Sequence, residues 1–391
     1  MTGKPTALYV HFPFCVQKCR YCDFLSFASP ELIPAYMEAL ISEVSRTVRQ
    51  LSRDGRQISS IFIGGGTPSL MSESQLSRLM DSVTDAPLCA DAEITIESNP
   101  GTLTKDLLTS MRRMGINRLS IGLQSADNEE LAALGRIHTF EQFEKNYAAA
   151  RDAGFSNINV DLMSALPGQT TLSYEQTLSR VLALEPEHIS AYSLIIEEDT
   201  PFYAYYELSE DCGFILPPLP DEDSERRMYH RTKQLLAGQG YHRYEISNYA
   251  RPGYECRHNI VYWRRKDYIG TGLGAASMIE NVRFSNTKDI RRYIELMRCG
   301  RLDDCREQIE HLSAADQMSE FMFLGLRMTD GISADEFQKT FGQTITAVYG
   351  PVIKKHIADG TLIFDRSRRQ LYLTDFGLDV SSYVMSDFII D

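Results

Sequence analysis

The chain has 391 residues, 43% of them hydrophobic and 24% charged, with a formal net charge of −13. These values are close to globular averages, and the sequence lacks any run near the ~18 apolar residues that a membrane span requires. The acidic balance argues against a general nucleic-acid-binding surface, and the length favours two or three domains of roughly 150 residues.

The first half of the chain alternates between strand-like and helix-like patterns. Strands are expected at Ala7–His11, Ile58–Ile63, Glu93–Glu97, Arg118–Leu123, Asn157–Asp161 and His188–Leu194. Helix-period segments are expected at about 31–53, 73–83, 104–114, 139–153 and 173–184. Six strands alternating with helices predict a parallel sheet, with the chemistry at the carboxyl ends of the strands.

Three cysteines, Cys15, Cys19 and Cys22, directly follow the first expected strand in the spacing C-x3-C-x2-C. Three thiolates can bind three irons of a [4Fe–4S] cube and leave the fourth iron open to a substrate. A structural cluster normally takes four cysteines, and a structural zinc site takes four ligands. The alternatives are zinc with His11 as the fourth ligand and unligated cysteines of the core.

Glycine and polar residues stand at the ends of the later strands. The second strand ends in Gly64-Gly65-Gly66-Thr67, where the backbone can approach a ligand closely. Glu97, Gln124 and Asp161 end the next three strands, so we expect them around one ligand. As alternatives, the glycines form a plain turn and the polar side chains cap loops.

The run His258-Asn259-Ile260-Val261-Tyr262-Trp263 holds the only tryptophan and is followed by Arg264, Arg265 and Lys266. Histidine can bind haem iron, aromatic rings can pack on a porphyrin, and cations can pair with propionates. The alternative is a packed loop with solvated basic residues. Gly270 to Gly274 is expected to be a loop near a ligand.

The C-terminal part is expected to hold a helical module. Helix-period stretches lie near 313–327, 334–341 and 345–358, and a hairpin follows at 362–373 with a further helix from Thr374, whereas a helix near 222–239 is expected earlier, in the middle of the chain. Helices followed by a hairpin predict a winged-helix-like module. The hairpin tip carries Arg366, Arg368 and Arg369, which in an acidic chain is a weak basis for DNA binding.

The cysteine spacing, with an aromatic residue before Cys22, resembles the signature of the radical S-adenosylmethionine (SAM) enzymes. In that superfamily the open iron binds SAM, and an electron from the cluster splits the sulfonium. The resemblance implies SAM contacts at Tyr9, Tyr21, Gly64, Gly65, Gly66, Thr67, Glu97, Gln124, Arg136 and Asp161.

The motif His258-Asn259-x-x-Tyr262-Trp263 is similar to the haem-binding signature of the HemW haem chaperones, in the HemN-like family of oxygen-independent coproporphyrinogen III oxidases. The resemblance implies an α/β fold, with a radical SAM partial (β/α)6 barrel and a C-terminal winged-helix-like HemN-type domain. The expected domains are a core at 1–245, a connecting segment with the haem motif at 246–305 and the C-terminal domain at 306–391.

Two functions follow from this resemblance. The first is a haem chaperone that passes haem, bound through His258, to an acceptor protein. The second is the oxidase, a radical enzyme that decarboxylates propionates to vinyl groups. The chaperone is favoured because Phe24 stands where the oxidases have a fourth cysteine, and because Cys15 lies almost at the start, without the oxidases' preceding segment.

The expected partners are haem and an unidentified acceptor, for which the resemblance suggests a respiratory enzyme. We expect no nucleic acid and no integral membrane span, and the sequence leaves peripheral membrane contact and a homodimer open. Met1 to Pro5 do not open a signal peptide, and eight cysteines without a paired framework fit a reducing compartment. The expected location is therefore the cytoplasm, with the inner face of the membrane as a further option.

Overall fold

Six parallel strands form the centre of the main sheet in the computed structural model, which describes residues 3–83 and 87–390. They are β1 (Lys4–Phe12), β2 (Arg56–Gly65), β3 (Leu88–Ser98), β4 (Arg118–Gln124), β5 (Ile158–Ser164) and β6 (His188–Ser193). Neighbours pair in chain order and in parallel. All seven residues of β4 are buried, as is typical of a parallel strand covered on both faces. The six strands expected from the sequence are confirmed.

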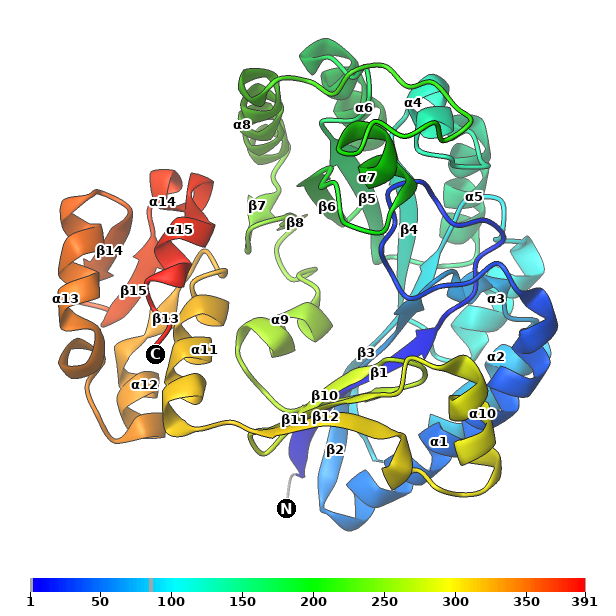
Figure 1. Ribbon diagram of the computed structural model, residues 1–391, viewed down its shortest axis with the longest axis horizontal. Helices are drawn as coiled ribbons and strands as arrows, with labels where there is room; N and C mark the ends of the chain where they lie inside the picture. The colour runs from blue at the N-terminus through cyan, green and yellow to red at the C-terminus, as the bar shows by residue number, and fades with distance from the viewer. Residues whose placement is uncertain (1–2, 84–86, 391) are drawn as a thin grey trace.

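The helices between these strands cover the convex face of the curved sheet (Figure 1). They are α1 (Ile33–Arg53), α2 (Glu73–Val83), α3 (Lys105–Arg113), α4 (Asn128–Ala133), α5 (Phe140–Asp152) and α6 (Thr171–Leu182). The hydroxyls of Thr104, Thr139 and Thr170 accept hydrogen bonds from first-turn N–H groups and so begin three of these helices. The five expected helices are confirmed, and α4 is an addition.

Both edges of the parallel sheet carry further strands. Beyond β1 lie β9 (Tyr268–Thr271), β10 (Ala276–Ile279), β11 (Val282–Asn286) and β12 (Arg306–His311), and beyond β6 lie β8 (Asn248–Ala250) and β7 (His242–Arg243). Over the described residues the sheet thus has 12 strands, and β9 pairs in parallel with β1. Much of the 246–305 segment therefore belongs to the main sheet.

The expectation of a ligand loop at Gly270 to Gly274 is wrong. Gly270 and Thr271 lie in β9, and the turn at Gly272 packs against β1. A Cβ at Gly272, where φ is +97°, would lie 2.6 Å from the carbonyl oxygen of His11. The glycine permits this close approach of two backbones, so its role is structural.

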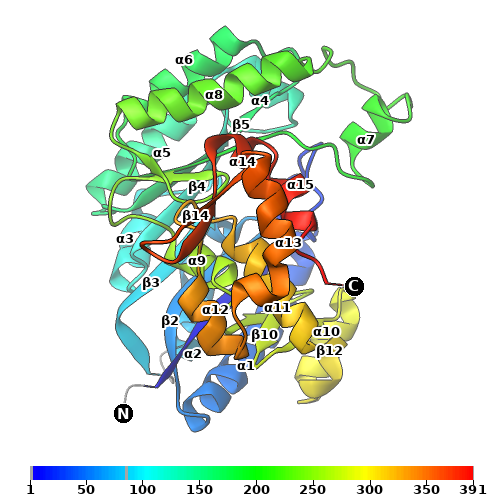
Figure 2. The ribbon, with the colours of Figure 1, turned by 90° about the vertical axis from the view of Figure 1, so that its left-hand side faces the viewer.

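A second core holds the C-terminal module together. Its elements are α11 (Ala314–Gly325), β13 (Ile332–Ser333), α12 (Ala334–Phe341), α13 (Ile345–Ala358), β14 (Leu362–Asp365), β15 (Gln370–Leu373), α14 (Asp375–Asp379) and α15 (Ser381–Ser386). The strands form a small sheet in the order β13-β15-β14. The expected helices and hairpin are confirmed. Figures 1 and 2 show the module across from the concave face of the main sheet.

Three further helices complete the first part of the fold. They are α7 (Pro201–Tyr206), α8 (Glu222–Gly238) and α10 (Ile290–Arg298). Helix α8 was expected from the sequence, and it packs against α6. Within the described ranges, none of the helices has both the length and the apolar character needed to cross a membrane.

Candidate functional site

The cysteine loop follows β1 and opens onto a cavity of about 450 Å³ at the carboxyl ends of the parallel strands. Cys15, Cys19 and Cys22 all line this cavity. The loop is closed by backbone hydrogen bonds from Phe27 N to Pro13 O, 2.7 Å, and from Cys15 N to Phe27 O, 3.0 Å. The fold thus brings the three thiols to one cavity, which we call the cysteine cavity.

Two hydrogen-bond donors reach the sulfur atoms. Thr67 Oγ1 donates to Cys15 Sγ at 3.5 Å, and Arg136 Nη1 donates to Cys19 Sγ at 3.6 Å. Hydrogen bonds to sulfur are one of the means by which a protein tunes an iron–sulfur cluster. Burial raises the pKa of the Cys22 thiol to about 11, so its proton must leave when metal binds.

The donor set suits iron–sulfur chemistry, since thiolates are the ligands of such clusters. Among residues 3–83 and 87–390, no three His, Cys, Asp or Glu side chains are already grouped as metal ligands. The assignment of Cys15, Cys19 and Cys22 to a [4Fe–4S] cluster therefore stays a prediction.

The glycine run at the end of β2, Gly64 to Gly66, lies against the start of the cysteine loop. Gly65 and Gly66 line the cysteine cavity, whereas Gly64 and Thr67 do not. A Cβ at Gly66 would lie 2.6 Å from the carbonyl oxygen of Phe14, and one at Gly65, where φ is +112°, would lie 2.6 Å from the His11 ring. Only glycine allows the two loops to approach this closely.

The polar residues at the strand ends meet in the cysteine cavity. Its lining includes Tyr21, Glu97, Gln124, Arg136 and Asp161. Glu97, Gln124 and Asp161, from three different strands, thus line one cavity, while the expectation that they surround one ligand, SAM, stays a prediction.

Tyr9, in contrast, does not line this cavity. Its hydroxyl is hydrogen-bonded to His11 Nδ1 at 3.0 Å, and its ring stacks on Phe62. A contact between Tyr9 and SAM therefore has no support in this geometry.

Asn99 and Tyr192 are among the side chains of the cavity wall that were not selected from the sequence. Asn99 Nδ2 donates to Thr67 Oγ1 at 2.9 Å, and its Oδ1 accepts from Arg136 Nη1 at 3.1 Å. Tyr192, in β6, donates to Gln124 Oε1 at 3.2 Å. Asn99 directly follows the third strand, so its position was a usable signal. Tyr192 lies within a strand and gave none.

Two partly buried carboxyl groups, those of Glu97 and Asp161, give the cysteine cavity its electrostatic character. Burial and the neighbouring Asp161 raise the pKa of Glu97 to about 8, and burial raises the pKa of Asp161. Gly65 N donates to Glu97 Oε2 at 3.0 Å. Such a pair of carboxyls favours a cationic ligand, because a positive charge nearby stabilises the ionised form.

Glu97 predicts a dependence of stability on pH. Its folded-state pKa is about 8 against an ordinary value of 4.5, so the unfolded chain loses the proton first as pH rises. Stability from this group is complete below pH 4.5 and is lost as the pH rises through 8. We expect the unfolding free energy of the ligand-free protein to fall by a few kcal/mol over this range, at about 1.4 kcal/mol per pKa unit.

Glu97→Gln should flatten this decline, because it removes the titrating proton. Thermal and urea unfolding at pH 5 to 9 measure it, with Glu144→Gln on the exposed side of α5 as the matched control. A variant that declines as steeply as the parent chain would show that Glu97 ionises normally.

The haem-motif segment is a helix, α9 (Arg257–Trp263), which packs against β2 on the concave face of the sheet. The segment is therefore helical, and the alternative of a packed loop is wrong in this respect. The carboxylate of Glu93 accepts the backbone N–H groups of Arg257 and His258, both at 3.0 Å, and this stabilises the first turn. Figure 1 shows α9 between the sheet and the C-terminal module.

His258 is enclosed beneath this helix, with only 1% of its surface exposed. Its Nδ1 is hydrogen-bonded to Ser60 Oγ at 2.9 Å and its Nε2 to the Tyr262 hydroxyl at 2.7 Å. Burial lowers its pKa to about 3, so the imidazole is neutral at physiological pH. Iron coordination would require one of these two hydrogen bonds to break.

The four motif residues face different surroundings. Asn259 lines the cysteine cavity, whereas His258 and Tyr262 do not. Trp263 lines a separate cavity of about 300 Å³ next to the C-terminal module, with the guanidinium of Arg327 4.2 Å from its ring centroid. Residues of this one short helix therefore line two separate cavities.

The cations after the motif are already paired with carboxylates of the C-terminal part. Arg264 pairs with Asp330 at 2.5 Å, Arg265 with Glu320 at 2.9 Å and Lys266 with Glu336 at 2.8 Å. The sequence suggested that these cations pair with haem propionates, but in this structure each already pairs with a carboxylate. They attach α9 to the module.

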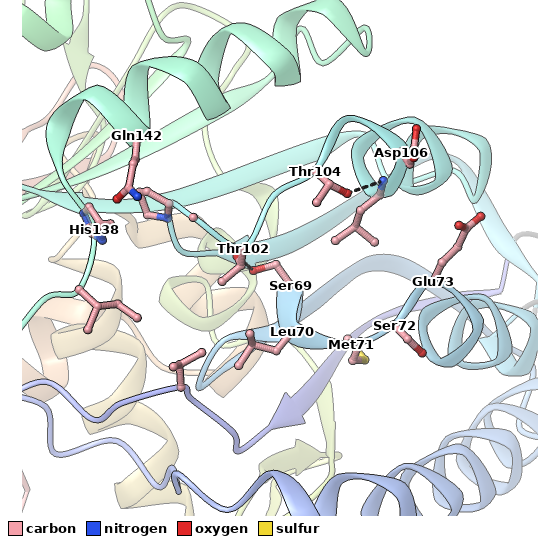
Figure 3. A pocket seen from close by; sticks show the side chains of 15 residues that line it. Ser69, Leu70, Met71, Ser72, Glu73, Thr102, Thr104, Asp106, His138 and Gln142 are labelled. Atoms are coloured by element: carbon pink, nitrogen blue, oxygen red, sulfur yellow. Dashed lines mark hydrogen bonds between the residues drawn. The ribbon is translucent and has the colours of Figure 1, made fainter.

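A further cavity, of about 580 Å³, adjoins the outer side of the cysteine loop at Val16 (Figure 3). Its wall includes the hydroxyls of Ser69 and Thr102, 2.5 Å apart, and His138. Burial and Arg136 lower the pKa of His138 to about 4, and its Nε2 has no hydrogen-bond partner within the described residues. The cavity contains none of the predicted site residues.

Residues 9–181 match the family model of the radical SAM superfamily, and residues 312–380 match that of the HemN C-terminal domain. The chain is 35% identical to the heme chaperone HemW of Lactococcus lactis subsp. lactis (strain IL1403), over 100% of this chain and 99% of that protein. It is 38% identical to HemW of Escherichia coli (strain K12), over 92% of each chain. The chain belongs to the HemW family.

The fold of this HemW family member resembles a solved structure described as coproporphyrinogen III oxidase (HemN) from Escherichia coli, a radical SAM enzyme. The TM-score is 0.84 at 25% identity, covering 100% of this chain and 91% of that one. The predicted fold, an α/β radical SAM partial barrel with a C-terminal HemN-type domain, is confirmed.

Proposed function

We propose that this chain is a haem chaperone that binds haem and transfers it to an acceptor protein. We also propose that it carries a [4Fe–4S] cluster that binds SAM. The observation that carries the proposal is the similarity to HemW proteins, named heme chaperones, over essentially the whole chain. The motif His258-Asn259-x-x-Tyr262-Trp263 supports the haem assignment.

The cysteine cavity would hold the cluster and SAM. Cys15, Cys19 and Cys22 supply three sulfur ligands, and Arg136 and Thr67 supply hydrogen bonds to sulfur. When bound, such a cluster binds SAM at its open iron and can supply an electron. Glu97 and Asp161 supply negative charge for the sulfonium, and Gly65 and Gly66 let the backbone approach the ligand.

His258 would bind haem iron through Nε2. Its neutral imidazole is the form that ligates metal, and Ser60 at Nδ1 occupies the place of the orienting partner that metal-bound histidines usually have. Access requires the Tyr262 hydroxyl to leave Nε2. Asn259 on the cysteine cavity and Trp263 beside Arg327 are the contacts proposed on either side of the helix.

The oxidase reaction is not proposed for this chain. Phe24 occupies the position of the oxidases' fourth cysteine, and its ring is 62% exposed on the wall of the cysteine cavity. A phenyl ring cannot replace a thiolate as a metal ligand or a proton donor.

Anaerobic reconstitution with iron and sulfide, followed by haem titration, tests the chaperone proposal. We expect a shifted Soret band at about one haem per chain and passage of the haem to apomyoglobin, used as the acceptor probe. Coproporphyrinogen III, supplied with SAM and reductant, should yield no protoporphyrinogen IX. Failure to bind haem, or sustained porphyrinogen turnover, would contradict the proposal.

The location and the partners are also proposals. All eight cysteines are free, which supports a reducing compartment such as the cytoplasm. A respiratory enzyme as acceptor, contact with the inner face of the membrane and a homodimer stay predictions of the family resemblance.

A further inference from the structure

A second large cavity, of about 660 Å³, lies between α1, the strands β9 to β11 and the start of β12. This volume is within the range of small-molecule sites in proteins. Five arginines line it, Arg46, Arg49, Arg53, Arg56 and Arg306, and we call it the arginine cavity. Arg56 is the first residue of β2, whereas the cysteine cavity lies beyond the other end of that strand. The two cavities are therefore at opposite ends of the sheet.

Only part of this positive charge is balanced by the protein. Arg56 pairs with Asp267 at 2.6 Å and Glu280 at 2.8 Å, and Arg306 pairs with Asp303 at 3.2 Å. In the described part of the chain, Arg46, Arg49 and Arg53 have no carboxylate within ion-pair distance. Three guanidinium groups thus stay uncompensated in a chain whose net charge is −13.

These three arginines follow one another along one face of α1, since their spacing is three and then four residues. Like charges at this spacing destabilise a helix. Arg53, in the last turn, is favoured there by the helix dipole, but Arg46 lies two turns earlier, beyond the reach of that effect. Helix stability therefore does not explain why these three arginines share one face of α1. An anion that contacts all three would explain it.

The strands contribute apolar side chains to the arginine cavity, beside Arg56 and Arg306. Ile269 of β9, Ile279 of β10 and Phe284 of β11 line it. The guanidinium of Arg306 lies 4.7 Å from the centroid of the Phe284 ring. A ligand in this cavity would meet guanidinium groups from α1 and the strands, and hydrocarbon from the strands.

We propose that the arginine cavity binds an organic anion with an apolar body and at least two carboxylate or phosphate groups. Guanidinium groups bind both kinds of oxyanion in bidentate geometry, and the isoleucines and Phe284 would cover the body. This site is independent of the proposed haem function, because none of its residues belongs to α9 or to the cysteine cavity.

Two probes distinguish the sources of this chemistry, coproporphyrin III for carboxylates and adenosine diphosphate for phosphates. Each is titrated by calorimetry into the full chain and into the triple variant Arg46→Gln, Arg49→Gln, Arg53→Gln. The control, Arg113→Gln, Arg226→Gln, Arg366→Gln, removes the same charge from exposed positions elsewhere. We expect at least one probe to bind the parent chain and the control equally and the triple variant at least about tenfold more weakly.

The probe that shows this difference identifies the anionic group. The unfolding midpoint of the triple variant should be equal to or above that of the parent chain, because like-charge repulsion is removed. Binding of neither probe to the parent chain, or equal binding to the parent chain and the triple variant, would overturn the proposal. Porphyrin bound at the haem site contributes equally to all three proteins and leaves the comparison intact.

Discussion

Replacement of Cys15, Cys19 or Cys22 by Ala should abolish the iron–sulfur cluster. Each thiol lines the cysteine cavity, and a three-ligand site that loses one ligand keeps only two protein bonds to a cube of four irons. Iron in the anaerobically reconstituted protein should fall from about four per chain to below about one. Iron and sulfide analysis and the visible absorbance of the cluster measure this loss.

Cys299→Ala is the matched control, because Cys299 is an exposed free thiol far from the cysteine loop in the sequence. It should retain the full cluster. The three loop variants should also unfold at nearly the same temperature as the parent chain without iron, since these thiols are partly exposed. A full four-iron cluster in the triple Cys→Ala variant would place the cluster elsewhere.

The second large effect concerns haem. His258→Ala should lower haem affinity by about tenfold to a hundredfold and shift the Soret band, because it removes the proposed iron ligand. Tyr262→Phe should act in the opposite direction. It removes the hydroxyl that now holds Nε2 at 2.7 Å, a bond worth about 1 kcal/mol, and should tighten binding about fivefold.

Opposite effects of these two substitutions would exclude a general loss of structure as the cause. His230→Ala, at a half-exposed histidine of α8, is the control and should change nothing. Unchanged spectra and affinities in both variants would move the iron ligand away from His258. His11, His242 and the cysteine thiols would then be the next candidates.

The parallel strands could be predicted because the residue pattern that marks each strand lies within a few consecutive residues. In β4 the apolar residues Leu119, Ile121 and Leu123 alternate with other residues, which is the period of a strand, and the polar residue at its end marks the functional edge of the sheet. The cysteine loop, Glu97 and Asp161 were found in this way. Their meeting in one cavity follows from strand order alone.

Helix α9 could not be predicted from its own seven residues. It is too short for a periodic pattern, and the Glu93 carboxylate that stabilises its first turn lies more than 160 residues earlier in the sequence. The pairing of Arg264, Arg265 and Lys266 likewise depends on carboxylates of the distant module. Contacts of this kind leave no local signal, so the burial of His258 was missed.

The strands β9 to β12 were missed for a related reason. Each has only four to six residues, and several of their positions are polar or half-exposed. They are stabilised as additions to an existing sheet edge at β1 and not by a hydrophobic pattern of their own.

Helix α9 lies between two cavities and contributes a residue to the lining of each. One side is bonded to β2 through His258 and Ser60, and Asn259 borders the cysteine cavity. The other side carries Trp263 beside Arg327, and the residues that follow are joined to the module by three ion pairs. A ligand that shifts this helix from either side must alter binding on the other side by the same factor, because such coupling is reciprocal. Under the proposed function, such a shift would link haem binding thermodynamically to the binding of SAM in the cysteine cavity.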